Sequence, residues 1–361
     1  MRYQTKEKIV GLLFVLPYMA LFNLLLLYPF AKGFWISLHD WNLLEVAFNP
    51  DSKTFIGFDN YYKLFFPRSW DYEWDQLIVL RGMLLAILIG VSAYWYRQRT
   101  LTLTRIAWLV VGCLFVLVAM GWGPEGRGRM GDRRFWTSVA NTLQFVAMTV
   151  PTITILALLL AIRLNQPTRT AAALRTLFFG TQVLSVTVVT LIWQMMYSPS
   201  QGFITNVLKD LGLNAPAWLT DQHLAMPAIV ITTVWWSLGF ALVVFLSGLQ
   251  GIPSDRLEAA NLDNAKGLRL LWYIVLPSIK RTTSFVVVMQ IILHFQVFGQ
   301  SHLMTNGGPG DSTQVLVRYI YQSAFRDSEV GYASAMAMVL FLLMLVFSAI
   351  QMKLNKSEDA R

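Results

Sequence analysis

The sequence predicts an all-α protein that crosses a membrane about eight times, and three observations support this fold class. Hydrophobic residues make up 55% of the 361 residues and charged residues only 14%, against about 25% charged in soluble domains. Apolar runs long enough to cross a bilayer, about 20 residues each, recur along the whole chain. Lys and Arg are distributed unevenly among the intervals between these runs. Together these features exclude an ordinary soluble enzyme.

We expect eight transmembrane helices. They fall at residues 9–30, 77–96, 106–122, 138–162, 176–197, 226–249, 283–303 and 332–352. The first run follows three basic residues, but it is too long for a signal-peptide core and lacks a clear small-x-small cleavage site, so we interpret it as an uncleaved anchor. The single cysteine, Cys113, lies in an apolar run, which excludes an intrachain disulfide.

The uneven charge predicts the orientation. With both termini in the cytoplasm, the cytoplasmic intervals hold 17 of the 29 Lys and Arg residues but only 6 of the 20 Asp and Glu residues, and positive charge marks the cytoplasmic side of membrane proteins. A basic cluster within the predicted outer loop 127–134 departs from this trend locally. The hairpin 77–122 contributes two crossings, so its omission would leave every later loop on the same side.

An outer segment follows the first predicted span. Residues 34–75 are dense in aromatic and acidic side chains. We interpret the rings as an aromatic belt at the membrane surface, with contact to a partner protein as the alternative.

The one long polar interval in the C-terminal half, residues 251–281, predicts two short helices at an angle. Ser254 follows a proline and is expected to start a helix by accepting hydrogen bonds from free backbone N–H groups. This helix should end between Asn264 and Gly267, because both residue types tolerate a left-handed cap. Pro277 then interrupts a second amphipathic stretch and resets the chain direction.

The same interval resembles the EAA loop of the permease subunits of binding-protein-dependent ABC importers. The matching residues are Glu258, Ala259, Ala260, Asp263, Ala265, Ile274, Leu276 and Pro277. Asn264 replaces the central glycine of the family; asparagine is the next most tolerant of positive φ, and Gly267 is the alternative position for that turn. The resemblance implies that contacts to a cytoplasmic ATPase come from Glu258, Ala259, Ala260, Asp263, Asn264, Gly267 and Pro277.

Other stretches resemble the carbohydrate (maltose-type) branch of this family. They are FIGFDNYYKLF at 55–65, DRRFWTSVANTLQFV at 132–146, TNGGP at 305–309, YIYQSAF at 319–325 and GYASA at 331–335. The resemblance implies a six-helix permease core to which the hairpin 77–122 is an addition. The expected domains are a first helix with an outer segment (1–75), the additional hairpin with an outer loop (76–131), the permease core (132–352) and a cytoplasmic tail (353–361).

Polar and aromatic residues on two predicted spans are candidates for a substrate pathway. They are Thr233, Trp236 and Phe240 on one face of 226–249, and Leu293, Gln296 and Gln300 on one face of 283–303, with Phe295 adjacent. Aromatic faces and amides suit sugars, which present C–H faces and hydroxyls, but packing between helices explains the same residues equally well. The family places sugar contacts on these two spans, which favours Trp236, Phe240, Phe295 and Gln296.

The sequence lacks the groups that an enzyme or a self-powered pump would need. It contains no G-x-x-x-x-G-K-[ST] phosphate loop, no HExxH and no G-x-S-x-G. The predicted spans contain no Asp or Glu to carry a proton. The run 126–131 matches G-x-G-x-x-G formally, but a membrane span and not a strand precedes it, which argues against a dinucleotide site. His294 and His302 lack further ligands at metal-binding spacing, so we interpret them as packing or interface residues.

The resemblance implies that energy enters through partner proteins. We expect the non-enzymatic permease subunit of an ATP-driven sugar importer in the inner (plasma) membrane of a bacterium or archaeon. ATP and Mg²⁺ would bind two partner ATPase subunits, so no cofactor is expected on this chain. Further implied partners are a second similar permease, an external sugar-binding protein and the sugar, with no nucleic acid. The alternative is a stand-alone secondary carrier or channel for small polar solutes, which would have no need for the inner loop.

Overall fold

Helices dominate the computed structural model, which describes residues 13–66, 70–72, 78–97, 109–110, 112, 122–124 and 131–359. Four helices in this part of the chain are long and apolar enough to cross a membrane, and two bent helix pairs raise the number to six if each pair is one span. The four are Leu13–Ser37, Arg133–Leu164, Ala225–Gln250 and Val330–Ala349. A polytopic helical membrane protein is thus confirmed, with fewer spans among the described residues than the eight expected.

Residues 13–66 form one helix and a small cap, which we call the outer cap because the sequence predicts it on the outer side of the membrane. The helix Leu13–Ser37 includes α2 (Tyr28–Ser37), and it leads into β1 (His39–Asp40), α3 (Leu43–Phe48), β2 (Thr54–Phe55) and α4 (Asp59–Phe65), with β1 and β2 antiparallel. Asn60 on α4 ties the cap together, because its side-chain amide donates to the carbonyls of Ser37, at 2.9 Å, and His39, at 3.1 Å. The cap also contacts the core: the Leu43 N–H donates to the Ser328 carbonyl at 2.8 Å.

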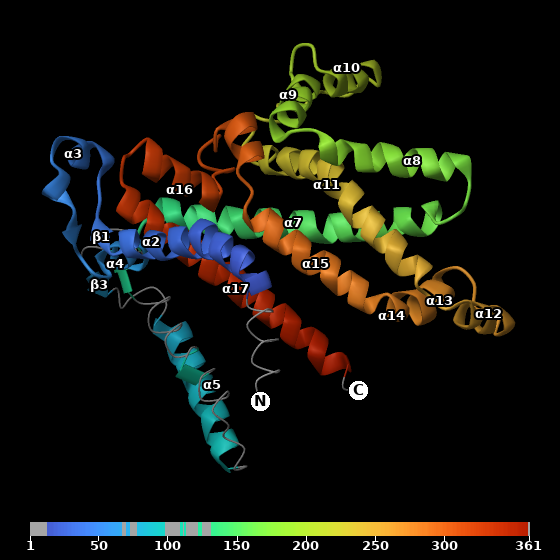
Figure 1. Ribbon diagram of the computed structural model, residues 1–361, viewed down its shortest axis with the longest axis horizontal. Helices are drawn as coiled ribbons and strands as arrows, with labels where there is room; N and C mark the ends of the chain where they lie inside the picture. Colours follow the sequence, from blue (N-terminus) through green and yellow to red (C-terminus); the bar gives the residue numbers. More distant parts are fainter. Residues whose placement is uncertain are drawn as a thin grey trace.

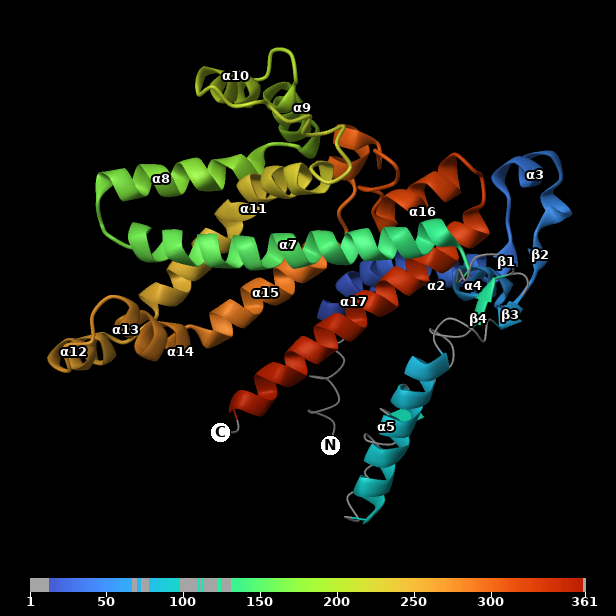
Figure 2. The same ribbon diagram turned by 180° about the vertical axis from the view of Figure 1, so that it is seen from behind.

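The expected additional hairpin is described in part. A helix is present where the first of the two was expected at 77–96: α5 (Ile78–Arg97) projects away from the other helices (Figures 1 and 2). It is not among the candidate spans, and its apolar part is Leu84–Trp95. The second predicted helix, 106–122, lies almost entirely outside the described residues. The two ends of this excursion pair as antiparallel strands, β3 (Trp70–Tyr72) with β4 (Trp122–Pro124).

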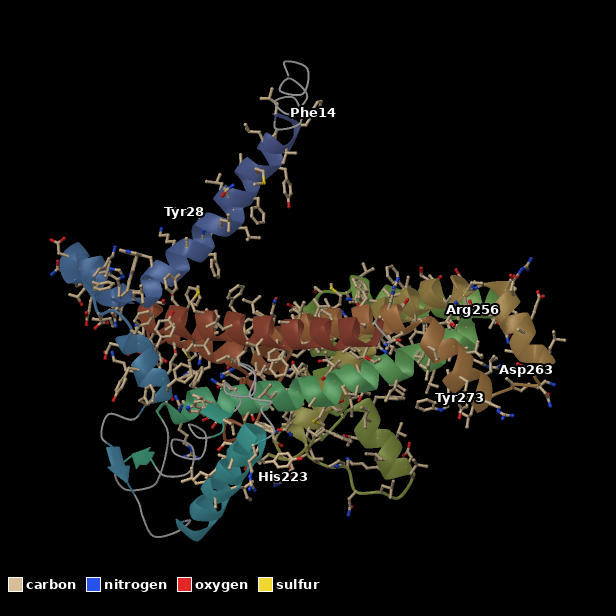
Figure 3. All side chains as sticks on the ribbon, turned by 90° about the horizontal axis from the view of Figure 1, so that it is seen from below. Phe14, Tyr28, His223, Arg256, Asp263 and Tyr273 are labelled. Carbon is tan, nitrogen blue, oxygen red and sulfur yellow. The ribbon has the colours of Figure 1, made fainter. Side chains whose placement is uncertain are left out.

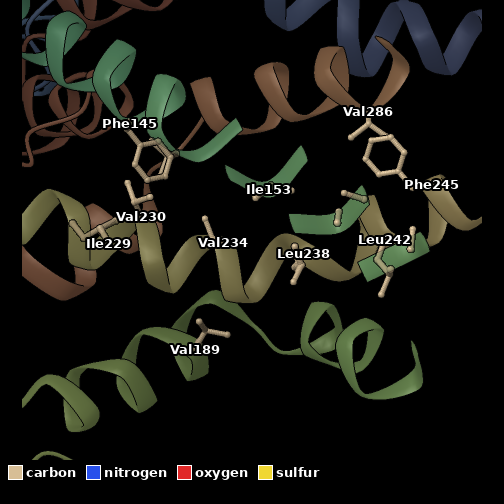
Figure 4. Packing of buried hydrophobic residues seen from close by; sticks show 14 of the residues in the cluster. Phe145, Ile153, Val189, Ile229, Val230, Val234, Leu238, Leu242, Phe245 and Val286 are labelled. Carbon is tan, nitrogen blue, oxygen red and sulfur yellow. The ribbon is translucent and has the colours of Figure 1, made fainter. Parts of the chain in front are cut away.

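The core is built around α7 (Arg133–Leu164) and α11 (Ala225–Gln250). Asp132 caps α7 by accepting from the Arg134 and Phe135 N–H groups, at 2.8 and 3.3 Å. Apolar side chains from both helices and α9 (Val186–Tyr197) form one buried cluster, which includes Phe145, Ile153, Val189, Ile229 and Phe245 (Figure 4). A second cluster joins α7 to α16 (Leu316–Phe325) and α17 (Val330–Asp359).

Two predicted spans are not continuous helices. The run 176–197 is divided between α8 (Arg169–Gly180), which continues as a 3₁₀ turn to Val183, and α9, and the two parts meet at 106°. Ser185 starts the new direction by accepting from the Val188 N–H at 3.4 Å. The run 283–303 corresponds to α15 (Lys280–Phe295), which ends well before residue 303 and is followed by a π turn at Ser301–Thr305.

Candidate functional site

The polar interval 251–281 contains the expected short helix, α12, at Ser254–Leu262. Its start at Ser254 is confirmed, but the expected cap is wrong. Ser254 is itself the first helical residue, and its hydroxyl bonds to the Asp255 carboxylate at 3.3 Å instead of accepting from the backbone. A first-turn donor is used by the backbone instead, because the Arg256 N–H donates to the Pro253 carbonyl at 3.2 Å.

The end of α12 uses both residues that the sequence left as alternatives. Asn264 has a left-handed φ of 53°, and the Ala265 N–H donates to the Ala260 carbonyl at 2.9 Å. This six-residue closure is a Schellman motif, in which the left-handed residue ends the helix. Gly267 then adopts φ 57° and ψ −127°, a conformation that residues with a Cβ avoid. Asn264 therefore stops α12, and Gly267 starts the next direction.

The second half of the loop is one short helix with an irregular centre. It comprises α13 (Leu268–Leu270), a π turn (Leu271–Val275) and α14 (Leu276–Ser278). This stretch meets α15 at 74°. The predicted change of direction is confirmed, although the helix continues one residue beyond Pro277 and breaks at Ile279.

Large apolar side chains of the loop are not covered by the rest of the chain. Leu262 is 89% exposed, Leu268 73%, Trp272 66% and Tyr273 75%. Glu258, Ala259 and Asp263 are also exposed, whereas Ala260 is buried. Arg256, Asp263 and Tyr273 lie together at one end of the molecule (Figure 3), far from the outer cap (Figure 1). An exposed apolar surface of this kind marks an interaction site.

A second feature is a cavity of about 290 Å³ between the two broken helices, which we call the midspan pocket. It brings together three of the five predicted pathway residues, Thr233, Trp236 and Gln296. Its remaining lining residues are Gln182, Val186, Ser237, Leu293, His294, Val297, Phe298, Gly299 and Gln300. The lining is uncharged apart from the titratable His294, and three of its polar side chains are the amides of Gln182, Gln296 and Gln300.

The pocket exists because the chain turns beside it. Trp236 Nε1 donates to the Leu184 carbonyl, at 3.1 Å, where the helix direction changes, and the Thr181 hydroxyl donates to the Trp236 carbonyl at 3.2 Å. The polar atom of Trp236 is therefore occupied, and the ring surface is what it offers to the cavity. On the opposite side, a Cβ at Gly299 would lie 2.7 Å from a Val186 methyl, so glycine permits the close approach of that loop.

The structure does not bring the other two predicted residues to this pocket. Phe240 is half-buried on α11, one helical turn away from Trp236. Phe295 is 1% exposed and packs against Phe347, with ring centroids 5.1 Å apart, in the second core cluster. Gln182 is a lining residue that sequence analysis missed, and its signal was an amide within the apolar run 176–197.

Both histidines pack against aromatic rings, in agreement with their interpretation from the sequence. His294 is 4% exposed, its Nδ1 bonds to the Gln290 carbonyl at 2.7 Å, and its ring lies 5.9 Å from that of Phe145. His302 stacks on Phe298 at 4.9 Å. Among the described residues, no group of three His, Cys, Asp or Glu side chains is placed to hold a metal ion.

Comparisons with known proteins agree with this geometry. Residues 116–358 match the family of binding-protein-dependent transport system inner membrane components. A probable ABC transporter permease protein of Pyrococcus horikoshii is 31% identical over 264 residues, which cover 72% of this chain and 89% of the relative. The diacetylchitobiose uptake system permease protein NgcF of Streptomyces coelicolor is 30% identical over 302 residues, covering 72% and 85%.

A solved structure shows the same fold. It is the crystal structure of a bacterial alginate ABC transporter in complex with an alginate pentasaccharide-bound periplasmic protein, and one of its chains superimposes with a TM-score of 0.55 at 20% identity. The match covers 95% of that chain but 77% of this one. The family match over two thirds of the sequence decides the assignment: the chain belongs to the inner membrane components of binding-protein-dependent transport systems.

Proposed function

We propose that this chain is the membrane-spanning permease subunit of an ATP-driven importer for a sugar or oligosaccharide. Relatives support the substrate class: NgcF is named for diacetylchitobiose, and the alginate transporter carries an acidic polysaccharide. The midspan pocket supports it too, because amide groups beside a tryptophan ring suit hydroxyls and C–H faces. Thr233, Trp236 and Gln296 would contact the sugar, and Phe240 and Phe295 would support the adjoining helices.

The exposure of the loop 251–281 is the observation that supports coupling of this chain to an ATPase subunit. Isolated helices below roughly 12 residues are marginal in water, and α12 has nine residues. Leu262 on α12 and Leu268, Trp272 and Tyr273 on the stretch after it are not covered by the rest of the chain. Contact with another protein would supply the missing burial, and a cytoplasmic ATPase subunit is the partner that an importer of this family requires.

The remaining parts of the proposal concern the assembly. We infer eight crossings with both termini in the cytoplasm, from the charge asymmetry of the loops. The C-terminal end of α17 lies on the same half of the molecule as α12 (Figure 1), which supports this orientation. A second similar permease, two ATPase subunits with their ATP and Mg²⁺, and an external sugar-binding protein would complete the transporter in the inner membrane.

Substitution of Glu258 tests the coupling role. In a partly desolvated interface, removing one member of a charge pair costs about 2–5 kcal/mol because the other charge is left unpaired. Glu258→Ala should therefore leave the protein in the membrane but weaken binding of the ATPase subunit or uncouple ATP hydrolysis from sugar uptake. Copurification and uptake in proteoliposomes measure the two effects.

Asp255→Ala is the matched control on the same helix. Asp255 contributes mainly to the first-turn dipole interaction, which is worth about 0.3–1 kcal/mol, so its loss should change little. Normal uptake by Glu258→Ala at wild-type expression would contradict the coupling role of Glu258. A protein that transports without any copurifying ATPase would instead support the stand-alone carrier.

A further inference from the structure

Gln194 on α9 links two segments that lie 109 positions apart in the sequence. Its side-chain Nε2 donates to the Leu303 carbonyl at 2.8 Å and to the Met304 carbonyl at 3.3 Å. Both acceptors belong to the π turn Ser301–Thr305, which directly follows the pocket-lining residues 297–300. Gln194 itself is half-buried and is not one of the lining residues. It therefore acts on a neighbour of the pocket and not on its contents.

The two carbonyls need a donor from elsewhere because they lie at the end of a helical turn. Asn306 ends the turn in a left-handed conformation, with φ 50° and ψ 36°. The N–H groups of the next two residues bond back to the Ser301 and Thr305 carbonyls, at 3.2 and 3.0 Å, and the third residue is Pro309, which has no N–H. The last carbonyls of a helix lack partners within it, and the amide of Gln194 supplies the donor.

Helix α9 meets the same segment at a second point, inside the midspan pocket. A Cβ on Gly299 would lie 2.7 Å from a Val186 methyl group, and both residues line the pocket. Val186 is the first residue of α9, and Gln194 lies about two helical turns further along. The helix thus contacts the segment 297–305 at two separate places along its length.

The core holds α9 independently of Gln194. The Tyr197 hydroxyl donates to the Ala228 carbonyl of α11 at 3.1 Å. Trp193 is buried and packs against Trp235 of the same helix, with ring centroids 5.8 Å apart. Because α9 is anchored in this way, the hydrogen bonds of Gln194 position the π turn against a fixed support.

We propose that Gln194 is a positioning residue for the midspan pocket. By capping the π turn, it holds the lining residues 297–300 against α9 and so determines the shape of that wall of the cavity. The inference rests on the proposed importer function only for the use of the pocket in transport. The effect on the pocket itself can be measured without any sugar.

Cysteine accessibility in the assembled transporter, purified in detergent, tests this role. In a Cys113→Ser background, Ser237→Cys places a thiol on the pocket lining, and Ser323→Cys places one on α16, at a side chain that is 2% exposed. Gln194→Met keeps the length of the side chain and removes the donor. It should raise the rate at which a polar thiol reagent labels position 237 by about tenfold, as expected for the loss of two hydrogen bonds of ordinary net strength. Labelling at position 323 should not change.

Two further variants separate the donor from the bulk of the side chain. Gln194→Lys restores a donor, and basic side chains bond the last carbonyls of helices, so labelling at position 237 should return to the wild-type rate. Gln201→Met is the matched control, because Gln201 is an exposed glutamine shortly after α9 and lies outside the pocket lining. It should leave both labelling rates at the wild-type value.

Three outcomes would overturn the positioning role. They are equal labelling of position 237 in the wild type and Gln194→Met, a rise at positions 237 and 323 together, which would mean that Gln194 stabilises the whole fold, and a lysine variant that labels as fast as the methionine variant. Uptake is scored separately. A complex that shows the expected labelling but no ATP-dependent uptake of any sugar would remove the importer function and leave the role of Gln194 in place.

Discussion

The two ends of the protein differ in how far the chain covers its own side chains. At the outer end, side chains of residues 301–318 form a hydrogen-bonded network: the Thr313 hydroxyl bonds to the Thr305 hydroxyl at 2.6 Å and to the Gly308 carbonyl at 2.8 Å. The side chain of Arg318 is 6% exposed and donates to Gln314 and, at 2.7 Å, to Asn306. At the other end, the large apolar side chains of the loop 251–281 are not covered by the rest of the chain.

This difference indicates where the protein is preorganised and where it depends on a partner. Hydrogen bonds between buried side chains and the backbone hold a segment in one conformation. A helix of nine residues is marginal on its own, so α12 gains its order from a partner that covers the exposed apolar side chains of the loop. The outer end should therefore determine the stability of the isolated chain, and the inner loop should determine its assembly.

Cysteine labelling gives the largest expected effect, because it decides whether the two ends face opposite sides of the membrane. In a Cys113→Ser background, cysteines at Lys266 and Ser357 should be protected from an impermeant thiol reagent in intact cells, whereas a cysteine at Asp327 should react. All three should react after the membrane is permeabilised. Labelling of position 266 from outside would reverse the orientation and remove the basis for the coupling role.

Alanine substitutions at two glycines with positive φ, one at each end, test which end determines the stability of the isolated chain. Gly307 has φ 81°, and a Cβ there would collide with Gln314 and Arg318; Gly307→Ala should destabilise the isolated chain by about 2–4 kcal/mol, seen as a lower thermal midpoint. Gly267 has φ 57° and open space around its Cα. Gly267→Ala should strain only the loop, by about 1–3 kcal/mol, which weakens ATPase binding at an unchanged midpoint. Equal midpoints for both variants would contradict the comparison.

The smallest expected effect is a pH-dependent change in thermal stability at Glu329, which lies at the outer end. Burial raises the pKa of its carboxyl, as do the charges of Asp327, Asp40 and Asp132, while Lys63 opposes the shift. The folded state therefore favours the protonated form, and stability falls as the pH rises from the unfolded pKa through the folded one. Glu329→Gln should match the wild type near pH 4 and have the higher thermal midpoint at pH 8. A lower midpoint for the variant at pH 8 would show that the carboxylate is stabilising.

Local chemistry made the inner loop predictable from the sequence. Proline, asparagine and glycine restrict the backbone through their own covalent structure, so the start of α12 and the turn after it could be located without tertiary information. The bend between Val183 and Val186 could not, because the run 176–197 is apolar throughout and the turn depends on Trp236, more than 50 positions away. Phe295 was misplaced because it was chosen as a neighbour of the face that holds Leu293 and Gln296, whereas its ring packs against Phe347 on α17.

The strand pair β3–β4 determines how the segment between its two strands is attached to the rest of the protein. Antiparallel partners lie about 5 Å apart, so Tyr72 and Trp122, which face each other across the pair, begin and end the excursion at nearly the same point. Because the two ends of this segment are adjacent, its removal should leave the residues before and after it in place. Replacing residues 73–121 by a two-residue Asn-Gly link would regenerate an ordinary hairpin, with the permease core unmoved.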